Sequence, residues 1–188
     1  GLSKVLSEPV IAFIGDSTFF HAGLPALANA VHGGHKMMLI VLDNSTTAMT
    51  GHQPHPGTNV NAFGEAAPAL RIEKIVESFG IESLRIIDPY DFKDAVRAIK
   101  EEFEQKRLSV IISRRTCALL EIAERGKILG KRRAIDQAKC KKCGTCVDGL
   151  GCPAIARQEN VYEINEILCV GCGVCEQICP HGAIGVKK

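Results

Sequence analysis

Long hydrophobic runs, tryptophan and an excess of charge of either sign are what this 188-residue sequence lacks. No apolar run approaches the roughly 18 residues of a membrane-spanning helix, and the first residues show no signal-peptide pattern, so we expect no membrane segment. With 23 basic and 21 acidic side chains the net charge is only +2, which gives no basis for binding nucleic acid. With no Trp and two Tyr, protein absorbance is low, so a bound cofactor that absorbs visible light would be conspicuous.

What the sequence does have is an uneven distribution of cysteine and charge. Eight of the nine cysteines fall within residues 140–188, and the preceding tract, residues 126–142, carries 7 basic groups and 1 acidic group. The length allows one full-sized domain and a small one. We therefore expect an α/β domain at residues 1–125, a basic linker at 126–139 and a cysteine-rich domain at 140–188. The basic tract is either a solvated linker or a cationic collar beside an anionic centre.

The first region alternates between strand and helix patterns. The expected strands are 10–14, 37–42, 84–87 and 109–112, and the expected helices are 25–31, 66–79 and 91–105. The first two strands are continuous apolar runs, as is typical of buried parallel strands. This order predicts a parallel sheet of the α/β class with right-handed crossovers. The polar segment 45–61 is too long for a simple connection.

The cysteine-rich region contains an internal repeat. Cys140, Cys143 and Cys146 recur 29 residues later as Cys169, Cys172 and Cys175, while Cys152-Pro corresponds to Cys179-Pro. The second copy is the C-x2-C-x2-C-x3-C-P run of bacterial two-cluster ferredoxins. Disulfides fit poorly because the cysteine count is odd and nothing indicates secretion. Structural zinc usually uses two separated C-x-x-C pairs. The pattern favours two [4Fe–4S] clusters over either alternative.

In such ferredoxins the fourth cysteine of each run binds the other cluster. The expected ligands of one cluster are Cys140, Cys143, Cys146 and Cys179, and those of the other are Cys169, Cys172, Cys175 and Cys152. Five residues separate Cys146 from Cys152, where the standard run has three, and Gly149 and Gly151 permit the detour. Cys117 stands alone, so we expect it to be a small buried hydrophobic residue.

Two oxygen-bearing side chains follow the first two expected strands. Asp16 and Asn44 each come directly after a strand, where parallel sheets bind ligands, and both offer the oxygen donors that Mg²⁺ prefers. The segment Gly15–Thr18 also opens a helical stretch whose N–H groups could receive phosphate oxygens. These residues have an alternative interpretation, because an Asp before a helix is commonly an N-cap and Asp-Asn-Ser is commonly a turn.

Longer sequence motifs help to decide between a cofactor site and an ordinary helix cap and turn. Gly15-Asp16-Ser17 followed by Asn44 resembles the GDG…N motif of thiamine diphosphate enzymes, and Thr50-Gly51-His52-Gln53 resembles the TGxQ loop of 2-oxoacid:ferredoxin oxidoreductases. GDSTFFHAGLPAL at 15–27 and LDNSTTAMTGHQPHPGT at 42–58 are similar to the α subunits of the indolepyruvate ferredoxin oxidoreductase family. That family carries a thiamine-binding domain followed by a two-cluster ferredoxin tail, which is the order found here.

This resemblance implies a fold and a set of binding residues. The fold would be part of a parallel-sheet thiamine diphosphate-binding domain followed by a small α+β ferredoxin-like domain with two [4Fe–4S] clusters. The implied Mg²⁺ ligands are Asp16, Asn44 and the carbonyl of Thr46. The implied cofactor contacts are Gly15, Ser17, Thr18, Thr50, Gly51 and Gln53. The implied catalytic candidates that could face substrate or cofactor are His21, His52 and His55, although each could instead be a loop histidine bonded to backbone.

The implied activity is oxidative decarboxylation of aryl 2-oxoacids to acyl-coenzyme A, with electrons passing through the clusters to ferredoxin. A pyruvate or 2-oxoglutarate type of oxidoreductase is the alternative, and so is a non-catalytic electron-transfer subunit. Thiamine diphosphate also needs a pyrimidine-binding domain, for which these residues have no room. We therefore expect the chain to be incomplete alone and to work in the cytoplasm with the rest of an α subunit or another chain, and with a β subunit.

Overall fold

The computed structural model describes residues 1–159 and 161–187. By internal contacts the chain divides into two units, Gly1–Cys117 and Ala118–Lys188, each with its own sheet structure. Within the described ranges no helix is long and apolar enough to cross a membrane.

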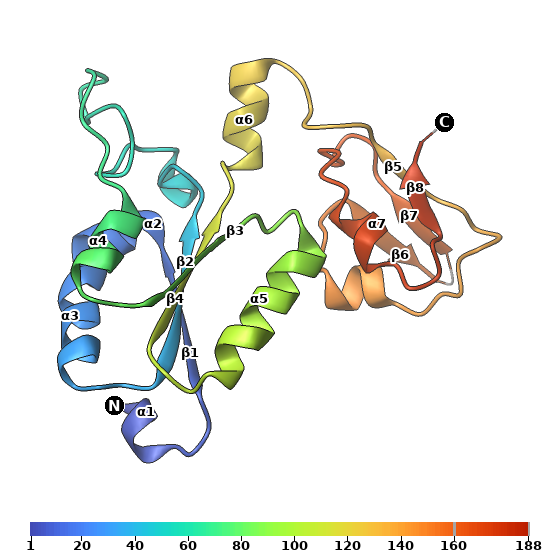
Figure 1. The fold of residues 1–188 in the computed structure, drawn as a ribbon. Helices are drawn as coiled ribbons and strands as arrows, with labels where there is room; N and C mark the ends of the chain where they lie inside the picture. Colours follow the sequence, from blue (N-terminus) through green and yellow to red (C-terminus); the bar gives the residue numbers. More distant parts are fainter. Residues whose placement is uncertain (160, 188) are drawn as a thin grey trace. The chain divides into compact units, whose positions relative to one another are not determined.

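The first unit is built on a four-stranded parallel sheet with strand order β1-β2-β4-β3. Its elements are α1 (Leu2–Val5), β1 (Val10–Gly15), α2 (Asp16–Thr18), the π-helix η1 (Phe19–Gly23), α3 (Leu24–His32), β2 (Met37–Asp43), the 3₁₀ helix η2 (Ala48–Thr50), α4 (Ile72–Ser78), β3 (Ser83–Ile87), α5 (Phe92–Glu104) and β4 (Ser109–Arg114). Figure 1 shows the strands running side by side through the middle of this unit. The expected α/β class is confirmed.

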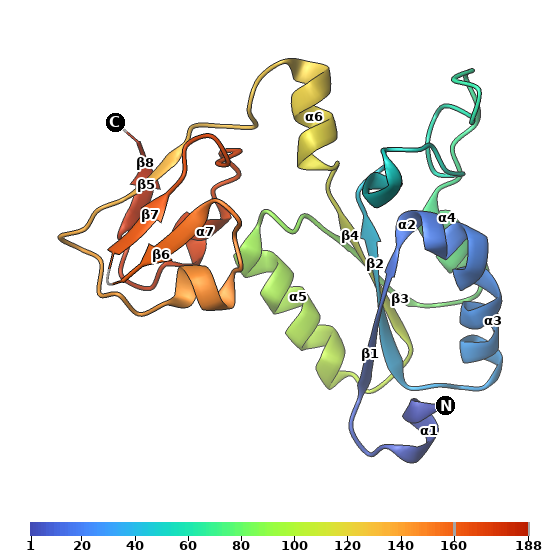
Figure 2. The same cartoon turned by 180° about the vertical axis from the view of Figure 1, so that it is seen from behind.

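Helices cover both faces of the sheet. Helices α3 and α4 lie on one side and α5 on the other, as Figure 2 shows from behind. The two cores follow from the alternation of side chains along β2: Leu39 and Val41 belong to the core that contains α3 and α4 residues, whereas Met38 and Ile40 pack with α5. Burial on both faces explains why β2 reads as an unbroken apolar run.

A helical stretch begins directly after β1. It starts at Asp16 as α2, widens into the π-turn η1 and continues as α3. Pro25 lies in the first turn of α3 and has no N–H to donate to the preceding turn, so the hydrogen-bond ladder is interrupted where the helix widens. The helical stretch therefore begins nine residues before Pro25, where β1 ends, and not at Pro25 as the sequence pattern suggested.

One expected helix is shorter than the sequence pattern suggested. Helix α4 covers Ile72–Ser78, whereas the pattern favoured 66–79. Ala66 forms an antiparallel bridge with Val60, and Pro68 cannot donate a helical hydrogen bond, so residues 66–71 are irregular.

The second unit contains two small antiparallel sheets, β5 with β8 and β6 with β7. Its elements are α6 (Ala118–Arg125), β5 (Arg133–Ile135), the π-helix η3 (Thr145–Gly149), β6 (Ile155–Gln158), β7 (Val161–Ile164), α7 (Val174–Ile178) and β8 (Ile184–Val186). Its buried core is small and consists of Ile155, Cys175 and Ile184 with partly buried neighbours.

The basic tract is not a free linker along its whole length. Strand β5 lies inside the range 126–139 that was expected to be a linker, and it pairs with β8. The N–H of Leu129 also donates to the carbonyl of Val170 at 3.0 Å. The contact boundary falls after Cys117 rather than at 125. The expected bounds were placed by charge. In β5 the charged side chain of Arg133 is only 16% exposed and pairs with Glu176, so a basic residue lies within a paired strand.

Candidate functional site

Two neighbouring strands end together and deliver the first group of polar residues. Strands β1 and β2 pair in register with Gly15 opposite Leu42. Asp16, which follows β1, therefore meets Asp43 and Asn44, at the end of β2, at the same edge of the sheet. Asp16 is only 3% exposed. The structure thus brings a buried carboxylate to the carboxyl end of a parallel sheet, which is the position at which such sheets bind ligands.

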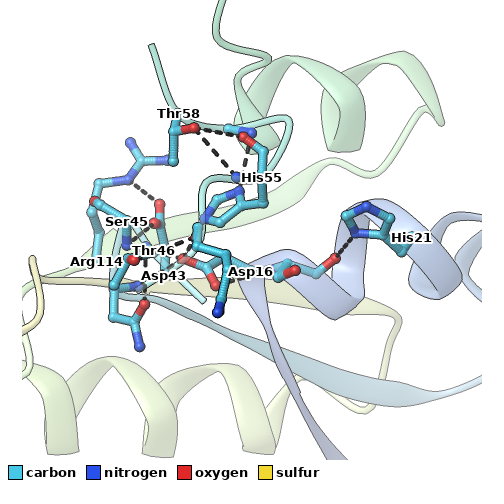
Figure 3. A network of polar contacts seen from close by, with 12 residues as sticks. Asp16, His21, Asp43, Ser45, Thr46, His55, Thr58 and Arg114 are labelled. Atoms are coloured by element: carbon cyan, nitrogen blue, oxygen red, sulfur yellow. Dashed lines mark hydrogen bonds and ion pairs between the residues drawn. The ribbon is translucent and has the colours of Figure 1, made fainter. Parts of the chain in front are cut away.

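Backbone donors hold the Asp16 carboxylate (Figure 3). Its Oδ2 accepts the N–H groups of Asn44 at 3.0 Å and Ser45 at 2.9 Å, and its Oδ1 accepts the N–H of Ser17 at 2.8 Å. The side-chain oxygen of Asn44 accepts the N–H of the buried Thr46 at 3.1 Å. Asp16, Asn44 and Thr46 are therefore neighbours in one compact loop arrangement, while Thr18 is exposed.

His55 is the closest side-chain neighbour of Asp16. Its side chain is 1% exposed, and its Nε2 lies 3.1 Å from Asp16 Oδ2. The N–H of Gly57 donates to its Nδ1 at 3.1 Å, and the ring stacks on Phe20 with centroids 5.7 Å apart. In Figure 3 the imidazole lies against the Asp16 carboxylate. The residue was expected to face substrate or cofactor, and the structure turns its Nε2 to Asp16.

The other two candidate histidines lie elsewhere. His21 is exposed, and its Nδ1 lies 2.7 Å from the carbonyl oxygen of Ser17, although it lines the same cavity as His55. His52 has a left-handed backbone, with φ of 62°, and its Nε2 lies 3.9 Å from Cys117 Sγ. Cys117 is half-buried beside this imidazole, so the expectation of a buried hydrophobic residue is wrong.

The segment after β2 forms a tight loop. Thr47 and Gln53 form an antiparallel bridge, and the Thr50 hydroxyl donates to Gln53 Oε1 at 2.6 Å. Gly51 has φ of 115°, which other residues rarely adopt. The candidate contacts Thr50, Gly51 and Gln53 therefore belong to one turn whose exposed polar side chains bond to each other.

An ion-pair network ties the strand ends to α4. Arg114 at the end of β4 donates to Asp43 Oδ2 at 2.6 Å and to Glu73 Oε2 at 2.7 Å. The Arg114 guanidinium lowers the pKa of Glu73 to about 2, and its hydrogen bond to Glu73 raises the pKa of Arg114 itself. Sequence reasoning did not identify Asp43, Glu73 or Arg114. Only the position of Asp43 and Arg114 at strand ends could have suggested them.

The eight clustered cysteines of the second unit form two groups. Burial raises the pKa of Cys146, and the nearby thiolates that add to this effect are Cys140, Cys143 and Cys179. Burial also raises the pKa of Cys175 to about 11, with further contributions from Cys172, Cys152 and Cys169. In each group a cysteine from one run joins three from the other run. These are the groupings expected for the ligands of two clusters.

The two groups differ in exposure. Cys169 and Cys175 of one group are buried, whereas Cys143 of the other is exposed. A hydrogen bond with the Thr145 hydroxyl lowers the pKa of Cys143. The more exposed group lines a cavity together with Lys141, Lys142 and His181.

Two alternatives to clusters can be compared with the geometry. All nine cysteines are free thiols, so the disulfide alternative is not borne out. Within residues 1–159 and 161–187, no three His, Cys, Asp or Glu side chains are grouped so that they could hold one metal ion. That finding concerns a single ion such as zinc. A [4Fe–4S] cluster instead spaces its four thiolates around a cube of iron and sulfide atoms.

Family models match both units. Residues 2–113 match the thiamine pyrophosphate enzyme, C-terminal TPP binding domain, and residues 162–185 match the 4Fe-4S binding domain. The chain belongs to the thiamine pyrophosphate enzyme family. Thiamine pyrophosphate is another name for thiamine diphosphate.

The chain is also similar to curated oxidoreductase subunits. It is 44% identical to the indolepyruvate oxidoreductase subunit IorA of Methanothermobacter marburgensis over 184 residues, covering 98% of this chain and 29% of that protein. It is 44% identical to subunit IorA of Archaeoglobus fulgidus over 191 residues, covering 100% and 30%. Similarity to the pyruvate synthase subunit PorB of Methanothermobacter thermautotrophicus is 32% over 106 residues, covering 49% and 37%. The chain spans about three-tenths of the IorA relatives.

Proposed function

We propose that this chain is part of a thiamine diphosphate-dependent 2-oxoacid:ferredoxin oxidoreductase. The observation that carries the proposal is that one chain joins a thiamine pyrophosphate-binding domain to a 4Fe-4S domain, and that each unit brings together donors suited to its group. Thiamine diphosphate, when bound, supplies a carbanion that attacks a 2-oxoacid and permits loss of carbon dioxide. Iron–sulfur clusters accept electrons one at a time, so they suit an oxidation that follows.

The donor set at the edge of the first sheet fits a magnesium ion and a diphosphate. Asp16 is a buried carboxylate, and an ionised buried carboxylate is stabilised when a cation binds it. The amide oxygen of Asn44 accepts one N–H and retains a second lone pair. Asp16, Asn44 and the Thr46 carbonyl would hold Mg²⁺. Ser17 and Thr18, at the start of the helical stretch, would bind phosphate oxygens, and Gly15 leaves room for them.

The neighbouring loops would complete the cofactor site. We assign Thr50, Gly51 and Gln53 to the loop that covers the cofactor, because they form a preorganised turn next to the ion-binding residues. His21 lines the cavity next to His55 and would contact substrate. His52, whose Nε2 lies 3.9 Å from Cys117 Sγ, would either face the substrate or cofactor or have a structural role in the loop.

We propose two [4Fe–4S] clusters in the second unit. Their ligands would be Cys140, Cys143, Cys146 and Cys179 for one cluster, and Cys152, Cys169, Cys172 and Cys175 for the other. The grouping of the thiols supports this assignment, including the place of Cys152 in the widened first run. Electrons would leave through the more exposed cluster to a ferredoxin.

The substrate we propose is an aryl 2-oxoacid, with coenzyme A as acyl acceptor. Identity of 44% over nearly the whole chain with indolepyruvate oxidoreductase subunits supports this choice over a pyruvate type, for which the similarity is 32% over about half of the chain. A pyrimidine-binding domain and a β subunit would complete the enzyme. The thiol-rich second unit suits a reducing compartment such as the cytoplasm.

One experiment tests the cofactors and another tests the substrate. Anaerobic reconstitution with iron and sulfide should give a visible absorption band and about eight irons per chain. A count near four would contradict the second cluster. The assembled enzyme should then reduce benzyl viologen with indolepyruvate and coenzyme A faster than with pyruvate or 2-oxoglutarate. Faster reduction with pyruvate would favour the alternative substrate, and no reduction with any 2-oxoacid would favour an electron-transfer subunit.

A further inference from the structure

His55 is a buried imidazole whose hydrogen-bonding state is set by its own loop. Gly57 donates its backbone N–H to Nδ1 at 3.1 Å. An imidazole nitrogen that accepts a hydrogen bond carries no proton, so in the neutral ring the proton lies on Nε2. The nearest acceptor of Nε2 is Asp16 Oδ2, at 3.1 Å. The distance is that of a hydrogen bond, although the N–H direction is not aligned with this oxygen.

Several contacts fix the ring in this place. Pro54 and Pro56 flank His55 and restrict its backbone. The Thr58 hydroxyl and the Thr58 N–H both donate to the His55 carbonyl at 2.8 Å. A Cβ atom on Gly57 would lie 2.9 Å from His55 Cε1, so only glycine permits this approach. The loop therefore holds Nε2 toward Asp16 without help from a ligand.

The contacts on Asp16 are unequal between its two oxygens. Oδ2 accepts two backbone N–H groups, from Asn44 and Ser45, and also faces His55. Oδ1 accepts one backbone N–H, from Ser17. Oδ2 thus accepts two backbone hydrogen bonds and has His55 Nε2 within 3.1 Å. Oδ1 keeps a lone pair for a cation.

We propose that His55 is a positioning residue that holds Asp16 through Oδ2 so that Oδ1 is presented to the cofactor's metal ion. This inference rests on the proposed function, since the cation is the Mg²⁺ of thiamine diphosphate. His55 does not touch substrate in this role. Partners of this kind orient a metal-binding carboxylate, and their loss typically costs about 10- to 100-fold in metal affinity.

The test compares three variants in the assembled enzyme that contains this chain. His55→Gln keeps an N–H donor near the position of Nε2, whereas His55→Met keeps the length and removes the donor. His32→Gln is the control, because His32 is exposed at the end of α3 and outside the site. The dissociation constant of Mg²⁺ is measured by calorimetry at a fixed concentration of thiamine diphosphate. The electron paramagnetic resonance signal of Mn²⁺ bound in place of Mg²⁺ reports the symmetry of the site.

We expect His55→Met to raise the Mg²⁺ dissociation constant about 10- to 100-fold. His55→Gln should restore most of the affinity, and His32→Gln should leave it unchanged. At saturating Mg²⁺ the KM for the 2-oxoacid should be the same in all variants. Equal losses in the Gln and Met variants would show that only ring volume matters, and wild-type affinity in His55→Met would also overturn the proposal.

A measurement on the unmutated protein covers the case in which a variant misfolds. Nitrogen-15 spectra of histidine-labelled enzyme should show one imidazole with the proton on Nε2 that shifts when Mg²⁺ and thiamine diphosphate bind, and that is absent in His55→Gln. A His55 signal with the proton on Nδ1 would contradict the proposal. If the wild-type assembly binds no Mg²⁺ with thiamine diphosphate at all, the proposed function fails instead, and this outcome is separate from the others.

Discussion

The two units prepare their candidate ligands in opposite ways. In the first unit, backbone N–H groups bond to Asp16 at the ends of two strands, and His55 lies against it. The sheet that carries these strands has an apolar core on each face. In the second unit the candidate ligands themselves are part of a small core, where Cys175 packs between Ile155 and Ile184. The donors around Asp16 are thus in place without a cofactor, whereas we expect the fold of the second unit to depend on what its thiols bind. Metal binding that is coupled to folding in this way is common in small metal-containing domains.

Removing iron should produce the largest difference in stability between the two units. When a chelator strips the clusters, we expect amide exchange in β6, β7 and α7 to rise to that of an unfolded chain, while β2 and β4 remain protected. The reason is that the second unit has too few buried apolar residues to stay folded without its clusters. Hydrogen exchange followed by mass spectrometry measures both units in one sample. Protection that survives iron removal in the second unit would contradict the comparison.

Replacing Asp16 should weaken Mg²⁺ binding strongly and leave the iron content unchanged. Asp16→Asn keeps the shape of the side chain but removes its charge, and losing one partner of a buried charge pair costs about 3 kcal/mol or more. Mg²⁺ affinity should therefore fall about 100-fold or more, while the iron count stays at about eight. Calorimetry and iron analysis measure the two effects. Asp94→Asn on the exposed surface of α5 is the matched control, and an equal loss there would refute the assignment.

The two cysteine groups should respond unequally to the same substitution. Cys175→Ser places a poor ligand in a buried position, and we expect iron to fall toward about four atoms per chain. Cys143→Ser affects an exposed ligand, so more iron should be retained and the cluster should instead be lost faster in air. Iron and sulfide analysis before and after exposure to air separates these results. A larger initial loss in Cys143→Ser would reverse the order.

The smallest expected effect concerns the pH dependence of the first unit. Arg114 lowers the pKa of Glu73 from its usual 4.5 to about 2, so the unfolded state takes up this proton more readily than the folded state. The stabilisation by Glu73 is therefore fully present above pH 4.5 and is lost as the pH falls toward 2. In Glu73→Gln the free energy of unfolding should fall less steeply across this range. Circular dichroism of cluster-free protein measures the slopes, and identical slopes would contradict the prediction.

The sequence was sufficient to predict the four strands of the first unit, because strands depend on local periodicity. The two cysteine ligand sets follow from the spacing of the runs and the ferredoxin ligand rule, and they stay a prediction. The apolar run that became β2 is buried on both faces, and the C-x2-C-x2-C spacing repeats without ambiguity. The run that became β1 was expected to be buried too, but β1 lies at the edge of the sheet and exposes Ile11 and Phe13. The position of Asp16 followed from the same reasoning, since the carboxyl ends of neighbouring parallel strands must meet.

Contacts between distant residues could not be predicted in this way. His55 reaches Asp16, and Arg114 reaches Glu73, only because the loop and the helix return to the same edge of the sheet. The charge of the basic tract gave no sign that it contains a strand, β5, that pairs with β8. Pro68 and the bridge of Ala66 with Val60 overruled the helical pattern before α4.

Strand β1 has a consequence for handling the chain. In the sheet order it lies at one edge, with β2 as its paired neighbour, and its side chains Ile11 and Phe13 are 38% and 66% exposed. An open parallel edge with apolar side chains is a template on which another strand can add. We therefore expect the isolated chain to self-associate through β1 as its concentration rises during purification. Low protein concentration, or co-expression with a polypeptide that covers β1, should prevent this.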